Sequence, residues 1–210
     1  MKKKGDFVMN VKKTIENLKK RGFTVSYFNT AAQAAEYLDR SIDSQSVGIG
    51  GSVTLRDMGV YEKLAAHNEV FWQWYVPEGT PQEETYRKAE RADVYLSSVN
   101  AIAETGEILN IDGTGNRVAA TLYGHKKLYL VTGVNKIAAD YDAALWRARN
   151  IASPKNAQRL QKRTPCALHG DKCYDCSSPE RICRGLVVLW EPVKGIGETE
   201  VVLIGEALGY

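Results

Sequence analysis

Three polar segments of this 210-residue chain carry side chains that could perform chemistry, and each follows a short apolar stretch. The first, residues 48–54, contains Gly50, Gly51, Ser52 and Thr54. Glycines let a backbone approach a ligand closely, and a helix that follows points free N–H groups at an anion. The segment therefore predicts a phosphate or carboxylate site, although it matches neither a Walker loop nor the Gly-x-Gly-x-x-Gly pattern. An ordinary tight turn between a strand and a helix is the alternative.

The second segment, residues 98–117, interleaves polar side chains with glycines. Glu104 could act as a general base or nucleophile, and Arg117 could form a two-pronged contact with a carboxylate or phosphate. Gly113 and Gly115 precede a helix and form a second candidate anion site. In the alternative interpretation, the polar residues are turn and cap residues, and Arg117 binds an acidic neighbour of the same segment. The other candidate ligand-binding residues here are Asn100, Asp112 and Asn116.

The third segment, residues 131–136, ends in Asn135 and Lys136. If all three segments follow parallel strands, they lie along one edge of the sheet, and Lys136 joins Glu104 and Arg117 as a candidate catalytic residue. An ordinary exposed lysine is the alternative for Lys136. The chain has three histidines and no Gly-x-Ser-x-Gly motif, which argues against a Ser-His-Asp hydrolase.

Four cysteines lie within 18 residues, separated by six, two and six residues. Four thiolates suffice for tetrahedral Zn²⁺ or for an iron–sulfur cluster, and their softness excludes Mg²⁺ and Ca²⁺. The outer spacings match neither a common zinc finger nor a ferredoxin, so redox-active thiols and ordinary reduced cysteines stay open as alternatives. His169 is a possible alternate ligand. The candidate metal ligands are Cys166, Cys173, Cys176 and Cys183.

The apolar pattern predicts strands alternating with helices, which is typical of a mostly parallel open sheet with helices on both faces, an α/β fold. Strands are expected near residues 23–28, 47–50, 70–75, 93–98, 101–103, 108–111, 128–131, 186–190 and 201–204. Helices are expected over residues 7–21, 30–42, 80–91, 116–122 and 140–150, after Ser52, and beyond Pro154. We expect the last two strands to pair through a turn at Gly195 and Gly197.

Length and charge indicate one domain over residues 1–210, with a basic N-terminal helix (1–22) and a cysteine-rich loop (163–185). Residues 1–21 hold eight Lys/Arg and two Asp/Glu (8 − 2 = +6), so the remainder of the +3 chain carries 3 − 6 = −3. This pattern favours a solvated helix face over nucleic-acid binding. No apolar run approaches the roughly 20 residues of a membrane span, and no signal peptide follows the basic start, so a cytoplasmic protein is expected. The aromatic stretch 71–75 indicates core, or a homo-oligomer contact.

The longest motifs resemble the LUD (lactate-utilisation) domain family. They are residues 92–117, 133–137 and 153–160 and the cysteine tail 164–183. The resemblance implies a fold similar to the ribose-5-phosphate isomerase and CoA-transferase group, in which a glycine-rich loop like 48–54 binds phosphate or an acyl-CoA-type carbonyl. CoA transferases of this fold carry a glutamate in a segment to which residues 103–106 are similar only at Glu104 and Gly106. His125 stands where the family usually has proline.

Three functions follow as hypotheses. The resemblance and the cysteines imply an accessory or redox component of lactate oxidation to pyruvate, working with iron–sulfur partner proteins. The three polar segments indicate instead an isomerase- or acyl-transfer-type enzyme acting on a small anionic metabolite, phosphorylated or carboxylated. A non-catalytic ligand-binding or assembly module is the third.

Overall fold

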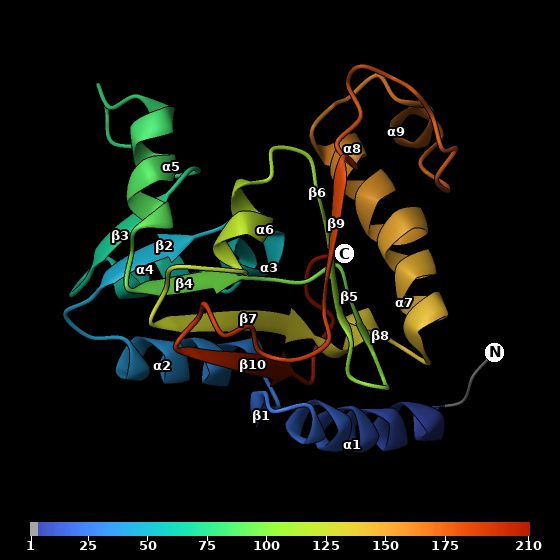
Figure 1. The fold of residues 1–210 in the computed structure, drawn as a ribbon, viewed down its shortest axis with the longest axis horizontal. Coiled ribbons are helices and arrows are strands. Elements are labelled where there is room, and N and C mark those ends of the chain that lie inside the picture. The colour runs from blue at the N-terminus through green and yellow to red at the C-terminus, as the bar shows by residue number, and fades with distance from the viewer. Residues whose placement is uncertain (1–3) are drawn as a thin grey trace.

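Six parallel strands form the main sheet of the computed structural model, whose backbone is described for residues 4–210 and whose side chains are described for residues 11–210 (Figure 1). Their spatial order is β1-β10-β7-β4-β2-β3, and each neighbouring pair is parallel. The central strands are buried along nearly their whole length, as expected of a sheet covered on both faces. The bounds are β1 (Thr24–Phe28), β2 (Ser46–Ile49), β3 (Glu69–Trp72), β4 (Val94–Ser97), β7 (Lys127–Gly133) and β10 (Glu198–Ile204).

A second, four-stranded sheet has the order β8-β5-β6-β9. Strand β6 is antiparallel to both β5 and β9, and β5 is parallel to β8. The expected pairing of the last two strands is therefore wrong. Strand β9 lies at the edge of the small sheet, whereas β10 lies between β1 and β7 inside the main sheet, where its apolar residues are buried on both faces. The bounds are β5 (Ala101–Ala103), β6 (Ile108–Asp112), β8 (Ile137–Ala138) and β9 (Gly185–Leu189).

Helices cover both faces of the main sheet. On one face α2 (Ala31–Ser41), α3 (Val53–Asp57) and α4 (Val60–Leu64) pack in one apolar cluster with β2, β4 and β10. On the other face the core joins α1 (Lys4–Lys20), α5 (Gln82–Glu90) and α6 (Asn116–Ala120) to the small sheet. The α/β fold with a mostly parallel sheet is therefore confirmed.

The small sheet is covered in turn by α7 (Tyr141–Arg147), and a π-helical turn, η2 (Ala148–Ala152), continues it into α8 (Ser153–Arg159). The short α9 (Pro165–His169) follows, and the cysteine segment then runs to β9. Figure 1 shows α7, α8 and α9 grouped on one side of the molecule, beyond β6 and β9. This layer closes one end of the main sheet.

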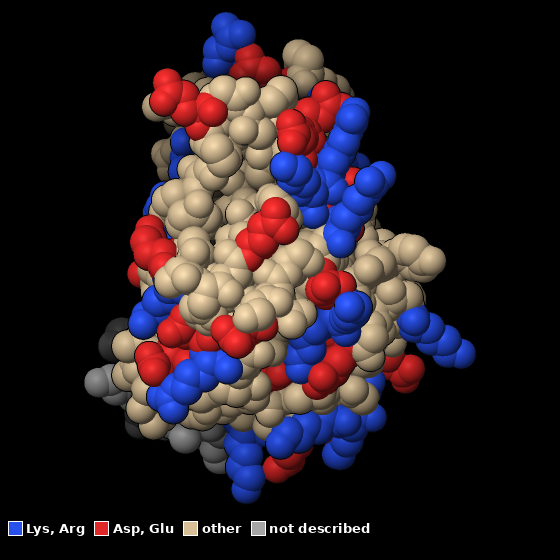
Figure 2. All heavy atoms as spheres, turned by 90° about the vertical axis from the view of Figure 1, so that its left-hand side faces the viewer, with Lys and Arg blue, Asp and Glu red and all other residues tan. Residues whose placement is uncertain are grey.

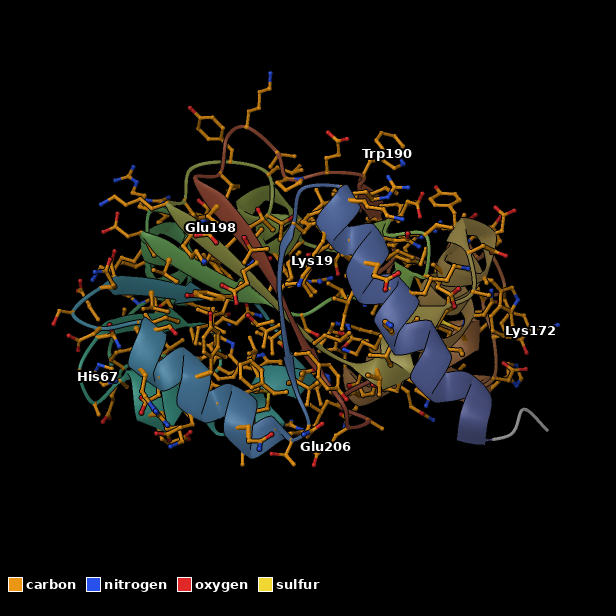
Figure 3. The ribbon with its side chains drawn as sticks, turned by 90° about the horizontal axis from the view of Figure 1, so that it is seen from below. Lys19, His67, Lys172, Trp190, Glu198 and Glu206 are labelled. Carbon is orange, nitrogen blue, oxygen red and sulfur yellow. The ribbon has the colours of Figure 1, made fainter. Side chains whose placement is uncertain are left out.

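Helix α1 packs beside β1 and β8, and Figure 3 shows Trp190 near its C-terminal end. Arg21, just after the helix, donates to the carbonyl of Trp190 and forms an ion pair with Glu107. Figure 2 shows acidic and basic side chains interspersed over one face of the molecule, without a single-sign patch there. None of the described helices is long and apolar enough to cross a membrane.

Candidate functional site

A cavity of about 800 Å³ opens where strands β2, β3, β4 and β7 of the main sheet end. The structure brings all three polar segments of the sequence to it, through residues 51–54, 98–100, 111–114, 116–117 and Lys136. Part of the segments 152–162 and 179–184, which belong to α8 and the cysteine segment, forms the opposite wall. Its lining residues are Ala152, Ser153, Asn156, Arg159, Leu160, Lys162, Pro179, Glu180, Arg181, Ile182 and Arg184. The position matches the rule that open α/β sheets bind ligands beyond the carboxyl ends of their strands, and the volume suits a small molecule.

Lys136 lies in the wall of this cavity, at the end of the 3₁₀ turn η1 (Val134–Lys136) that follows β7. Its Nζ donates to Ser98 Oγ at 3.0 Å and to Thr54 Oγ1 at 3.1 Å. Ser98 Oγ in turn donates to Thr54 Oγ1 at 3.3 Å. All three side chains are buried, so the ends of β2, β4 and β7 meet in one amine–hydroxyl cluster.

The environment of Lys136 favours its neutral form. Burial, together with the positive charges of Arg147 and Arg117, lowers the pKa of Lys136 from 10.5 to about 7. Within residues 11–210, no carboxylate forms an ion pair with this amine. A neutral amine can accept a proton or attack a carbonyl carbon, so this lysine is suited to chemistry near neutral pH.

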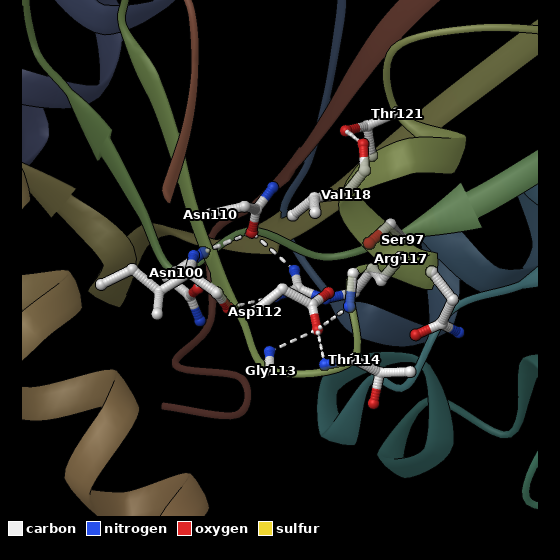
Figure 4. Close-up of polar contacts among 12 residues, drawn as sticks. Ser97, Asn100, Asn110, Asp112, Gly113, Thr114, Arg117, Val118 and Thr121 are labelled. Atoms are coloured by element: carbon white, nitrogen blue, oxygen red, sulfur yellow. Dashed lines mark hydrogen bonds and ion pairs between the residues drawn. The ribbon is translucent and has the colours of Figure 1, made fainter. Parts of the chain in front are cut away.

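Arg117, also in the cavity wall, directs its donors to the protein (Figure 4). Nη1 donates to Asn110 Oδ1 at 2.6 Å and to the carbonyl of Ser98 at 3.3 Å, and Nη2 donates to the carbonyl of Ile111 at 2.7 Å. Nε lies 3.4 Å from Asp112 Oδ2. The structure thus has the alternative arrangement, in which Arg117 binds an acidic neighbour and holds the backbone of Ser98 in place.

The turn at residues 112–115 is closed by its own acidic side chain (Figure 4). Asp112 Oδ1 accepts from the backbone N–H groups of Gly113 at 2.7 Å, Thr114 at 3.2 Å and Gly115 at 3.2 Å. The amides that were expected to bind a ligand anion therefore bind the Asp112 carboxylate. Gly113 is required for packing, because a Cβ there would lie 2.8 Å from the carbonyl oxygen of Ile182.

Some residues of the first segment support the fold, and others line the cavity or contact Lys136. Gly50 does not line the cavity, and a Cβ there would lie 3.0 Å from both Arg117 Cγ and Tyr95 Oη. Ser52 caps α3, with its Oγ accepting from the N–H of Leu55 at 3.1 Å. Gly51 lines the cavity, and Thr54 belongs to the lysine cluster.

The three asparagine candidates fix neighbouring chain segments. Asn100 Oδ1 accepts from the N–H of Ile111 at 2.6 Å, and Asn116 Nδ2 donates to Gln73 Oε1 at 3.3 Å. Both line the cavity. Asn135 lies outside the lining and accepts from the N–H of Leu208 at 3.1 Å, which places residues 208–210 beside the lysine cluster.

Glu104 is not brought to the cavity. It follows β5 and faces α1, where its carboxylate forms an ion pair with Lys13 at 2.6 Å. Asn17 of the same helix donates to the Glu104 carbonyl at 2.7 Å. The expectation that Glu104 and Arg117 share one cleft is therefore wrong, because β5 carries the chain into the small sheet before Glu104 is reached.

The four cysteines are free thiols of intermediate exposure. Nothing within the described chain brings three or more His, Cys, Asp or Glu side chains together as a metal-binding group. Two thiols instead contact arginines, Cys173 with Arg149 at 3.7 Å and Cys183 with Arg181 at 3.4 Å. This arrangement does not fit a preformed tetrathiolate centre, and zinc or an iron–sulfur cluster at these positions stays a prediction.

The sequence did not single out two parts of the site. Ser98 stands directly after β4, and its position at a strand end was the available signal. The second part is a set of basic residues on the opposite wall, which no spacing pattern marks. These residues are Arg159, Lys162, Arg181 and Arg184.

Comparison with known proteins identifies a family and a similar solved structure. The model of one family, the LUD domain, matches residues 11–204. The crystal structure of a DUF162 family protein from Deinococcus radiodurans is similar to this chain with a TM-score of 0.56 at 13% identity, covering 95% of this chain and 98% of that one. At that identity the likeness concerns the fold. No curated protein matches.

Proposed function

The chain belongs to the LUD domain family, and from that membership and the geometry of the cavity we propose that it is an enzyme of the acyl-transfer or isomerase type acting on a small anionic metabolite. The single observation that carries the proposal is the buried Lys136 amine, which lacks a carboxylate partner in the described chain and borders an open cavity. Burying an amine without an ion pair lowers its pKa and destabilises the fold. Such groups cluster at functional sites, so this lysine marks a candidate site.

The role that we assign to Lys136 is proton transfer at a carbonyl-bearing substrate. A general base works best when its pKa lies near the working pH, and the pKa of this lysine is lowered to about 7. Ser98 and Thr54 hold Nζ in the wall of the cavity in either protonation state, since a hydroxyl can both donate and accept.

The anionic character of the substrate is inferred from the charges of the cavity. Six basic residues line it, namely Lys136, Arg117 and the four of the opposite wall, against the two acidic residues Asp112 and Glu180. Arg117 is paired with Asp112, and Glu180 forms an ion pair with Arg163. The opposite wall therefore carries the excess positive charge, which suits a phosphate or carboxylate.

Ligand-induced thermal stabilisation tests the proposal. We expect a sugar phosphate, a CoA thioester or a hydroxy acid to raise the melting temperature of the protein. We expect Lys136→Met to abolish turnover of that ligand, whereas the exposed Lys126→Met, outside the cavity, retains it. Binding that persists with no turnover by the unaltered protein would instead identify a ligand-binding module.

A second candidate is the accessory role in lactate utilisation, and the cysteine segment favours it. Arg181, which lines the cavity, also contacts Cys183 Sγ and donates to the Cys176 carbonyl at 2.9 Å, so this segment adjoins the cavity. The role with iron–sulfur partners predicts bound metal. Metal analysis and visible absorption of aerobic and anaerobic preparations test it, and colourless, metal-free protein from both would exclude the cluster version.

A further inference from the structure

We propose that Ser98 is a covalent nucleophile, with Lys136 as its general base, and that the substrate is an activated acyl compound, a thioester or ester that carries an anionic group. The inference rests on the proposed function and deepens it by naming the attacking atom. Ser98 Oγ lies 3.0 Å from Lys136 Nζ, within the range that a nucleophile and its base require. A serine–lysine pair performs acyl transfer without histidine, in a chain with only three histidines.

The placement of Ser98 supports this role. It is the first residue after the central strand β4, it lines the cavity, and its side chain is nearly buried. Arg117 Nη1 donates to its backbone carbonyl at 3.3 Å, which fixes the main chain at that point. The hydroxyl is thus held between the end of β4 and the lysine, in a residue that lines the cavity.

The charges around Lys136 support its use as a base. The charged groups acting on it are Arg147 from α7 and Arg117 from α6, and both disfavour its protonated form. From α3 the amine meets Thr54, and from the chain end it meets Gly209, neither of which is charged. A neutral Nζ can therefore accept the Ser98 proton.

The Ser98 Oγ–H proton moves to Lys136 Nζ as Oγ attacks the carbonyl carbon, forming an Oγ–C bond. The bond from that carbon to the thiolate or alkoxide leaving group breaks, and the proton on Nζ passes to the leaving group. Water or a second acceptor then releases the acyl group from Ser98 by the reverse proton movements.

Labelling with a small fluorophosphonate, a phosphorylating probe of activated serines, tests the inference on the full chain. We expect one adduct by intact mass, mapped to Ser98, with a labelling rate that rises with pH through about 7 as the fraction of neutral Lys136 increases. Ser98→Ala should remove the adduct, and Lys136→Met should slow labelling by about 10²- to 10⁴-fold. Ser41→Ala, at an exposed serine of α2 outside the cavity lining, is the matched control and should label normally.

Failure of the inference and failure of the proposed function give different results. An adduct on Lys136 in place of Ser98, no adduct, or equal labelling of Lys136→Met would overturn the role of Ser98. The melting temperatures of the variants, measured without probe, establish that each is folded. Stabilisation by an anionic ligand that persists in Ser98→Ala would then leave the proposed function standing, whereas its absence in the unaltered protein would remove both.

Discussion

Lys136 and Arg117 lie in the same cavity wall, but they differ in how far their hydrogen-bonding groups remain available to a ligand. The guanidinium of Arg117 binds two backbone carbonyls and two side chains, so its donors are used within the fold. The amine of Lys136 binds two hydroxyls, one of which belongs to a candidate nucleophile. Residue type alone predicted both as catalytic, and their different partners arise from contacts between distant segments.

The pKa of Lys136 predicts a pH-dependent free energy of unfolding. Between about pH 7 and 10.5 the unfolded chain holds a proton on this amine that the folded chain has released. The free energy of unfolding should therefore rise with pH in that window, by at most ~1.4 kcal/mol per pH unit, relative to Lys136→Met. Urea titrations of both proteins at pH 7 and pH 9.5 measure this difference, and parallel pH profiles would contradict it.

Removal of the Arg117 side chain should be destabilising. Arg117→Met leaves Asn110 Oδ1, the Ile111 carbonyl and the Asp112 carboxylate buried without that partner, and we expect a loss of about 3–5 kcal/mol. The exposed Arg87→Met, which breaks only a surface pair with Glu83, should cost less than about 1 kcal/mol. Urea denaturation of the two variants compares them, and similar losses would show that the buried network contributes little.

At the scale of elements, the first polar segment depends on close packing of β2 against its neighbours. A Cβ at Gly48 would overlap the carbonyl of Ala89 on α5 and lie 2.8 Å from Tyr95 Cδ2 on β4. Gly48→Ala should therefore lower the free energy of unfolding by about 1–3 kcal/mol. Gly185→Ala is the matched control, because a Cβ there meets nothing within 4 Å. A change below about 0.5 kcal/mol at both positions would show that β2 can shift to make room.

The sequence predicted elements better than their pairing. The apolar run in β10 and the short run in β9 each predicted a strand, and both form. Their partners could not be predicted, because pairing depends on which face each strand buries after the intervening loop. Glu104 lies away from the cavity for a similar reason. The sequence predicted both β5 and β6, but it did not predict that they pair in a second sheet, separate from the main one.

At the scale of the molecule, the cavity combines segments that lie far apart in the chain. The strand ends were predictable, because parallel strands place their carboxyl ends on one edge. The basic wall of the cavity was not predictable. It comes from α8 and the cysteine segment, whose position depends on how α7 packs against the small sheet. The cysteine spacing indicated a metal site, whereas Arg181, between the last two cysteines, and Arg184, directly after Cys183, form part of the cavity wall.

The basic wall predicts salt-sensitive anion binding. Lys162→Glu, in the cavity wall, should weaken the binding of inorganic pyrophosphate by roughly two- to five-fold, and added salt should reduce the difference. Lys155→Glu makes the same charge change on an exposed residue of α8 outside the lining and should have a smaller effect. Isothermal titration calorimetry at two salt concentrations measures both. Equal effects of the two variants would place the anion outside this cavity.

The proposed chemistry depends on the protonation state of Lys136, which can be measured directly. Nuclear magnetic resonance of protein labelled with ¹³C and ¹⁵N in its lysine side chains follows each amine through a pH titration, and Lys136→Met assigns the signal. We predict a titration midpoint for Lys136 at about 7, well below the ordinary lysine value of 10.5. A midpoint near 10.5 would contradict the account, because the amine would then be charged at neutral pH and unable to accept a proton.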